Sequence, residues 1–227
     1  MYFSLQDVFN FLPSLLQGAV ITIAVSLLAF ALALLFGLVF GIARISRVAP
    51  VRGVAACYIQ FIRGTPLLLQ LFFIYYVLPY VGIVLSPFVS GVIGLTMNYA
   101  AYMAEVFRSG IQAIPKGQWE AGSSVGMSRA LLMRRIILPQ AIRIIVPALG
   151  NFFVSIFKDS ALVSVITLRD LMFSGQLLAS ATYKHFEIFT MVAVIYFLIS
   201  YPTAKLVEWV EAKIDITRRP TVIGMRV

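Results

Sequence analysis

Charged residues are scarce in this chain of 227 residues. Only 12% of its residues are Asp, Glu, Lys or Arg, whereas 61% are hydrophobic, and soluble domains carry roughly 25% charged residues. A water-soluble fold of this length cannot bury so much apolar surface, but a lipid bilayer can accommodate it. The composition therefore predicts an integral membrane protein in contact with lipid.

Cysteine and histidine are almost absent, since Cys57 and His185 are the only residues of their kinds. Cys57 cannot form a disulfide within the chain, and it cannot build a metal site alone. His185 lies in a polar stretch, where a surface residue is more common than a metal ligand. Because the sequence also shows no Ser-His-Asp triad or pair of catalytic carboxylates, we expect no metal and no enzymatic activity in this chain.

The chain also lacks the Gly-x-x-x-x-Gly-Lys-Ser/Thr sequence of a phosphate-binding loop, so it cannot bind ATP by that route. We therefore expect no cofactor in this chain. Basic residues outnumber acidic ones, and the net charge is +9. In a soluble chain this excess would favour a nucleic-acid partner. In a membrane protein it marks cytoplasmic loops, and we expect no nucleic acid.

Long apolar runs predict five membrane-spanning helices, because a span needs about 20 mainly apolar residues. We expect these helices at Leu15–Ala43, Pro66–Val84, Pro87–Gly110, Arg143–Phe157 and Ile188–Val210. The fourth run is short, so it is either broken or merges into a re-entrant segment. The expected fold is an all-α membrane protein in which residues 1–227 form one transmembrane domain.

The basic residues set the orientation. All but three of the 18 lie in the stretches Arg44–Arg63 and Arg108–Arg143 and in the tail from Lys205 onward. The exceptions are Lys158, Arg169 and Lys184. Because basic loops stay in the cytoplasm, we expect the N-terminus outside and the C-terminus in the cytoplasm.

The connection between the third and fourth expected spans, at about residues 110–140, carries the most specific motif. Residues Glu120–Ala141 read EAGSSVGMSRALLMRRIILPQA. This stretch resembles the signature loop of the membrane subunits of ABC importers, which reads Glu-Ala-Ala, three residues, Gly, nine residues, Ile, one residue and Leu-Pro. The residues in register are Glu120, Ala121, Gly126, Ile136, Leu138 and Pro139. Gly122 replaces the second alanine, which we expect to weaken the short helix by about 1 kcal/mol.

Three further stretches resemble the polar amino-acid branch of that family. They are FIRGTPLLLQLFFIYY at Phe61–Tyr76, NYAAYMAEVFRSGIQAIPKGQWEA at Asn98–Ala121, and KDSALVSVI at Lys158–Ile166. The resemblance covers about residues 14–212. It implies the permease subunit of a type I ABC importer of the histidine, glutamine and arginine permease type.

The resemblance also implies the setting and partners of the chain. The expected location is the bacterial cytoplasmic (inner) membrane, and the expected activity is uptake of a polar L-amino acid by alternating access. The expected partners are two ATP-binding-cassette ATPase subunits, which bind the ATP and Mg, a second permease subunit, identical or homologous, and an extracytoplasmic amino-acid-binding protein. The alternative is a secondary transporter or channel driven by an ion gradient, which often shows internal repeats that we do not find here.

The resemblance implies that Glu120–Ser128 forms a coupling helix that docks on an ATPase. The residues assigned to this contact are Glu120, Ala121, Gly126, Met127 and Ser128. Gly126 permits a close turn between two short helices, and Glu120 can pair with a basic group on the ATPase or with Arg129. The alternative is an ordinary solvated loop with a charged face.

Lys158 and Asp159 are the strongest candidates for a substrate site, together with the adjoining Ser160. Lys158 lies roughly 22 Å above Arg143 if the segment is helical, and an ionisable residue at such depth usually lines a substrate path. Lys158 can hold an α-carboxylate, and Asp159 can hold an α-ammonium or a cationic side chain. The alternative is a structural ion pair at a helix break.

Asn98, Tyr102 and Glu105 follow i, i+4, i+7 spacing and share one helix face. Asn98 and Tyr102 can offer hydrogen bonds to a ligand, or they can hold helices together. Glu105 lies three residues before Arg108, which favours a structural ion pair.

Two further motifs predict where helices begin. Thr167–Asp170 fits a capping box and predicts a short external helix, whose surface can receive a substrate-delivery protein. Arg63 to Pro66 mark the cytoplasmic start of the second span, where proline suits a first helical turn. We expect a structural role for Arg63 at this position.

Overall fold

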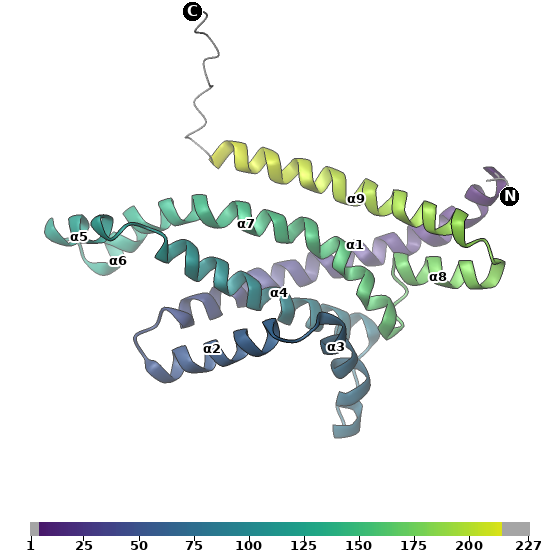
Figure 1. The fold of residues 1–227 in the computed structure, drawn as a ribbon, viewed down its shortest axis with the longest axis horizontal. Helices are drawn as coiled ribbons and strands as arrows, with labels where there is room; N and C mark the ends of the chain where they lie inside the picture. The colour runs from purple at the N-terminus through teal and green to yellow at the C-terminus, as the bar shows by residue number, and fades with distance from the viewer. Residues whose placement is uncertain (1–4, 215–227) are drawn as a thin grey trace, which may run out of the picture.

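The computed structural model describes residues 5–214, and its regular elements in this range are all helices (Figure 1). The α-helices are α1 (Leu5–Arg44), α2 (Ala49–Arg63), α3 (Leu67–Phe72), α4 (Pro87–Gln112), α5 (Lys116–Ser124), α6 (Arg129–Leu132), α7 (Leu138–Asp159), α8 (Leu171–Thr182) and α9 (His185–Ile214). Between them lie the π-helical turns η1 (Phe73–Val77) and η3 (Met133–Ile137) and the 3₁₀ segments η2 (Leu78–Val81) and η4 (Ser160–Ile166). The all-α expectation is confirmed for the described residues.

Three helical stretches within residues 5–214 are long and apolar enough to cross a membrane. They are Val8–Arg44, Arg129–Ile166 and His185–Ile214, and the bent pair Ala49–Arg63 and Leu67–Val81 makes a fourth if it counts as one span. Helix α4 is not among them, although it forms the expected third helix. It carries more polar residues, and much of its surface is buried by protein. The number of five spans therefore stays a prediction.

Helix α1 begins ten residues earlier than expected, at Leu5 rather than at Leu15. The extra turns are held by packing, because Val8, Phe11 and Leu12 lie against buried residues of α8 and α9. The start of α1 and α8 therefore lie at one end of the molecule, while α5 and α6 lie at the other (Figure 1).

Helices α1 and α4 pack closely because glycines let their backbones approach. A Cβ atom built on Gly41 would lie 2.8 Å from the Cβ of Phe107, and one on Gly37 would lie 2.8 Å from the Cβ of Met103. Such distances leave no room for a larger residue. The two helices thus form the centre of the largest apolar core, to which α7 and η4 also contribute.

The expected second span is divided in the structure. Helix α2, which the sequence analysis assigned to a connecting loop, ends at Arg63, and the helical axis then bends by 103°. Pro66 caps the new segment and cannot donate the amide hydrogen bond that a continuous helix requires. The segment continues through η1 and η2, and it ends at Val81 because Gly82 turns the chain with φ of +85°.

The expected fourth span, Arg143–Phe157, is wrong in its bounds. Helix α7 runs from Leu138 to Asp159, within a longer helical stretch that continues to Ile166. Pro139 lies in the first turn of α7, where a missing amide donor costs little. The α-helix therefore includes Lys158 and Asp159, and it changes to the 3₁₀ segment η4 from Ser160 onward.

The short helix after Thr167 is confirmed as α8, but its start differs from the expected capping box. Asp170 is the N-cap, and its Oδ1 accepts a hydrogen bond from the amide of Phe173 at 2.9 Å. Thr167 has φ of +62° and ends η4 instead. The final helix is longer than the expected Ile188–Val210 and spans His185–Ile214. The basic residues Arg218, Arg219 and Arg226 lie outside the described residues.

Candidate functional site

The α5–α6 loop forms the expected pair of short helices. Gly126 joins them with φ of +75°, a backbone conformation that glycine adopts without strain. Ser128 caps α6 by accepting a hydrogen bond from the amide of Leu131 at 3.4 Å. Gly122 has a packing role that the sequence did not suggest, because a Cβ atom there would lie 2.3 Å from Cδ1 of Leu132. Both the helix pair and the glycine turn are therefore confirmed.

The outer face of this loop is free to bind a partner. Glu120, Ala121 and Ser128 are exposed, and Val125 exposes 76% of its surface. Met127 is half-buried and anchors the loop on a small core beneath it. Within residues 5–214 the Glu120 carboxylate forms no ion pair, so the pairing considered with Arg129 is not made.

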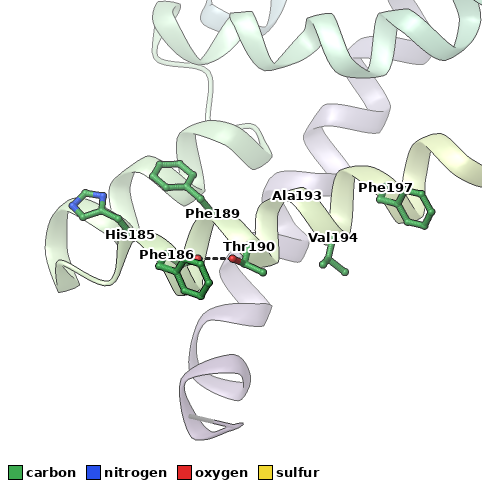
Figure 2. Close-up of a pocket in the computed structure, with 7 residues that line it drawn as sticks. All are labelled: His185, Phe186, Phe189, Thr190, Ala193, Val194 and Phe197. Atoms are coloured by element: carbon green, nitrogen blue, oxygen red, sulfur yellow. Dashed lines mark hydrogen bonds between the residues drawn. The ribbon is translucent and has the colours of Figure 1, made fainter. Parts of the chain in front are cut away.

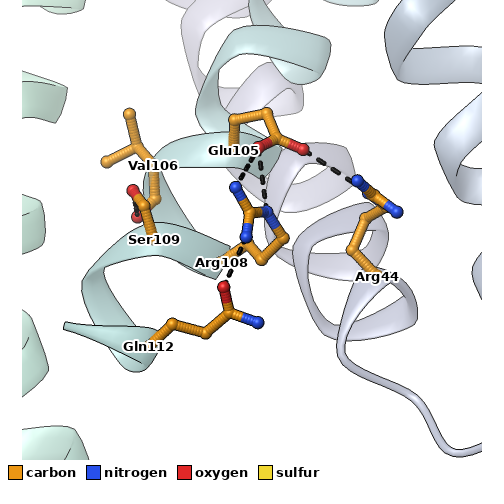
Figure 3. Close-up of polar contacts among 6 residues, drawn as sticks. All are labelled: Arg44, Glu105, Val106, Arg108, Ser109 and Gln112. Carbon is orange, nitrogen blue, oxygen red and sulfur yellow. Dashed lines mark hydrogen bonds and ion pairs between the residues drawn. The ribbon is translucent and has the colours of Figure 1, made fainter. Parts of the chain in front are cut away.

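A charged cluster ties α1 to α4 directly before this loop (Figure 3). The Glu105 carboxylate accepts hydrogen bonds from Arg108 at 2.7 Å and from Arg44 at 3.4 Å. Arg108 also donates to Gln112. The expected Glu105–Arg108 pair is confirmed, and Arg44 is a second partner that local spacing could not reveal.

A polar cavity of about 360 Å³ lies between the α2–α3 bend, α4 and α7. It is lined by Thr65, Pro66, Leu67, Asn98, Tyr99, Tyr102, Phe152, Ser155, Asp159 and Leu162. Three of the predicted substrate residues thus meet at one cavity, Asn98 and Tyr102 from α4 and Asp159 from α7.

Tyr99 holds the Asp159 carboxylate at this cavity. The Tyr99 hydroxyl donates a hydrogen bond of 2.7 Å to Oδ2 of Asp159. Tyr99 is buried in the core, whereas Asp159 is exposed. One carboxylate oxygen is therefore fixed by the protein, and the other has no such partner within residues 5–214.

Asn98 is held by Gln70, a residue that the sequence analysis did not single out. The Asn98 side-chain amide donates to Oε1 of Gln70 at 3.1 Å, and both residues are buried. Gln70 in turn donates to the carbonyl of Ile62 at 2.8 Å and to Oγ1 of Thr65 at 2.8 Å. Asn98 thereby connects α4 to the bend after α2.

Two predicted residues do not lie in this cavity. Lys158 belongs to a second cavity of about 250 Å³ between α7 and α9, whose polar residues include Glu208 and Glu211. Ser160 is fully buried and donates to the carbonyl of Phe157 at 2.8 Å. Consecutive helical residues point about 100° apart, so Lys158 and Asp159 face different spaces. Ser155 lines both cavities.

His185 lies on the surface, as expected. Figure 2 shows it at the start of a shallow apolar groove along α9, which continues past Phe189 to Phe197. The His185 and Phe189 rings stack with their centroids 6.2 Å apart. No group of three His, Cys, Asp or Glu residues that could hold a metal occurs within residues 5–214.

Sequence comparison assigns the family. Residues 33–216 match the binding-protein-dependent transport system inner membrane components. The chain belongs to this family. Among its relatives, the "Probable amino-acid ABC transporter permease protein y4tG" of Sinorhizobium fredii is 40% identical and covers 90% of this chain and 89% of its own length. The "L-cystine transport system permease protein TcyB" of Bacillus subtilis is 38% identical and covers 91% of this chain and 88% of its own length.

Solved structures show the same fold. A crystal structure of an amino acid ABC transporter with histidines superposes with a TM-score of 0.89 and 40% identity, covering 94% of this chain and 100% of that chain. The inward-facing methionine ABC transporter MetNI superposes with a TM-score of 0.72 over 88% of this chain and 96% of its own, at 18% identity. The second likeness concerns the fold alone.

Proposed function

We propose that this chain is the membrane subunit of an ABC importer that moves a polar L-amino acid into the cytoplasm. The family match and the relatives named as amino-acid permeases support this assignment. The observation that carries it within the structure is the cavity beside Asp159. Its volume of about 360 Å³ falls in the range of small-molecule sites.

Asp159 binds the positively charged group of the substrate. Its carboxylate is oriented by the Tyr99 hydroxyl, and it is the only charged side chain among the described residues that line the cavity. A carboxylate at membrane depth needs a compensating charge, which an α-ammonium or a cationic side chain supplies. Asn98 and Tyr102 line the same cavity and offer polar atoms to the substrate. Relatives named for glutamine and for cystine favour a net-neutral amino acid, and a substrate with a cationic side chain is the alternative.

Lys158 and Ser160 have weaker support as substrate residues. Lys158 faces the second cavity, which adjoins the first only at Ser155, and Ser160 is enclosed by protein. Direct contact of either residue with the bound substrate stays a prediction from the sequence.

The energy comes from two separate ATPase subunits that bind ATP and Mg. Each docks on one α5–α6 loop, through Glu120 and its exposed neighbours. ATP binding closes the ATPases and opens the permease outward, and hydrolysis returns it to the inward state. The loop lies in the cytoplasm in this proposal, in line with the basic residues that flank it.

A second permease subunit, identical or homologous, completes the path. The cavity opens at the surface of this chain, since Asp159 is exposed, and a closed route needs a facing wall. An extracytoplasmic binding protein delivers the substrate to the side that carries α8. The membrane is the bacterial inner membrane, with five spans if α4 and the bent α2–α3 pair each cross it.

The test is uptake by proteoliposomes that contain this permease with its ATPase and the binding protein. We expect uptake of one or more radiolabelled L-amino acids that requires internal ATP and stops with vanadate. Ionophores that collapse ion gradients should leave the rate unchanged. Uptake that needs a gradient and persists without the ATPase would favour the secondary-transporter alternative instead.

A further inference from the structure

The cavity described above contains a carboxylate but no cation among its described lining residues. An amino acid carries both charges at neutral pH, and leaving its α-carboxylate unpaired in a low-dielectric site costs several kcal/mol. Lys158, the cation that the sequence suggested for this role, faces the other cavity. A basic side chain that borders this cavity would satisfy the carboxylate.

Arg63 is a basic residue beside this cavity. It is the last residue of α2, and its guanidinium lies over the ring of Tyr102, 5.2 Å from the ring centroid. Tyr102 lines the cavity, as does Thr65, two residues after Arg63. The guanidinium thus lies at the rim of the cavity.

Arg63 is also available for a ligand. Within residues 5–214 no carboxylate lies within ion-pair distance of it, and its side chain is exposed. A planar guanidinium binds a carboxylate through two parallel hydrogen bonds. Arg63 can therefore supply the cation that the residues lining the cavity lack.

The backbone around Arg63 is held in place. Buried Gln70 donates hydrogen bonds to the carbonyls of Ile62 and Thr65 at 2.8 and 3.1 Å, on either side of the Arg63–Gly64 turn. Gln70 is itself fixed to α4 through Asn98. These bonds determine where the 103° bend places Arg63 relative to the cavity.

Both charges are linked to tyrosines of α4 that line the cavity. Tyr99 orients Asp159, and Tyr102 supports Arg63. These tyrosines are one helical turn apart on α4 and both line the cavity. The two groups of opposite charge thus border the same cavity from α2 and α7.

We propose that Arg63 binds the α-carboxylate of the transported amino acid, with the ring of Tyr102 as its support. This inference rests on the proposed function and specifies how the same cavity recognises its substrate. It replaces the purely structural role that the sequence suggested for Arg63. In a structural role the arginine would only cover Tyr102 and interact with the last carbonyls of α2.

The test measures recognition of the carboxylate itself. The probe is the L-amino acid that the wild-type complex takes up fastest in the proteoliposome screen, and the competitor is its α-carboxamide, which lacks the negative charge. Equilibrium binding is measured on the detergent-purified permease–ATPase complex without the binding protein, whose own selectivity would interfere. We expect wild type to prefer the acid over the amide by about ten-fold or more.

The variant Arg63→Gln should lose most of this preference, because it weakens binding of the acid about ten-fold and changes binding of the amide less than about two-fold. Arg63→Lys should keep part of the preference, since it keeps the charge. Arg47→Gln, an exposed arginine between α1 and α2, is the matched control and should behave as wild type.

An unchanged acid-over-amide preference in Arg63→Gln, or an equal loss for acid and amide, would overturn the assignment. If Arg63→Gln does not assemble, Arg63→Lys provides the test. Lysine keeps the charge but cannot form the two parallel hydrogen bonds of a guanidinium. An acid-over-amide preference equal to that of wild type, with normal affinity for both compounds, would therefore also overturn the assignment. Absence of uptake of any amino acid by wild type would instead refute the proposed function, so the two failures are distinguishable.

Discussion

The hydrogen bond between Tyr99 and Asp159 orients a carboxylate at the edge of the cavity. The hydroxyl satisfies one carboxylate oxygen from the core side, so the remaining oxygen can pair with a substrate cation without being fully desolvated. In the proposed function, the charge is thus oriented before the substrate arrives.

At this scale we predict that Asp159→Asn lowers substrate affinity by about ten-fold or more, because a charged pair is replaced by a neutral contact. Tyr99→Phe should give a smaller loss, since the carboxylate remains but is no longer oriented. Lys158→Ala should affect affinity least, because Lys158 faces the other cavity. Equilibrium binding to the purified complex measures all three, and a larger loss for Lys158→Ala than for Asp159→Asn would contradict this reading of the cavities.

Part of this site could be predicted from the sequence. Asn98 and Asp159 stand out in the sequence because burying polar side chains in an apolar segment is energetically unfavourable, which indicates a functional or structural role. Gln70 and Tyr99 were missed, since a glutamine or tyrosine beside apolar residues is common and their partners lie 28 and 60 positions away, respectively. The direction of Lys158 could not be predicted either, because it depends on whether the helix breaks or continues there.

At the scale of elements, the bend after Arg63 and the α1–α4 pair give the site its shape. The apolar runs predicted where most helices lie, because burial in lipid demands length and hydrophobicity. They could not predict the 103° bend, which depends on Pro66 and on the long-range bonds of Gln70. They also missed α2, whose buried residues Ala55, Ile59 and Ile62 recur at helical spacing within a basic stretch.

The close approach of α1 and α4 has a testable consequence. Gly41→Val should destabilise the protein by about 1–3 kcal/mol, because its side chain would collide with Phe107 and the backbone of Ala104. Gly53→Val is the matched control, since nothing lies within 4 Å of a Cβ atom there. Thermal unfolding of the detergent-solubilised protein compares the two, and equal melting temperatures would show that the helices do not need this contact.

The α5–α6 loop is the element through which force is expected to enter. Glu120 is exposed, and a basic replacement would repel a cationic docking site on the ATPase. We predict that Glu120→Arg reduces recovery of the ATPase in a pull-down by about ten-fold. Gln176→Arg on exposed α8 should not reduce it. Full recovery with Glu120→Arg would argue against a role of this carboxylate in docking.

At the scale of the whole molecule, the loop and the cavity are joined by one rigid pair of helices. Glu105 ties α4 to Arg44 of α1 beside the loop, and the same α4 carries Asn98, Tyr99 and Tyr102 at the cavity. In the proposed function, a displacement of the loop would be transmitted to the substrate residues along α4. We expect the substrate path to form between two permease subunits, with the ATPases acting on it from one side.

The central claim is that the α5–α6 loop faces the cytoplasm and receives the ATPase. The most direct measurement labels Val125→Cys, which replaces a residue that is 76% exposed, in a Cys57→Ser background, because Cys57 is exposed too. A membrane-impermeant maleimide should label this cysteine in inside-out vesicles and not in right-side-out vesicles, and bound ATPase should block the reaction. Labelling from the outer side, or labelling that the bound ATPase does not affect, would contradict the account.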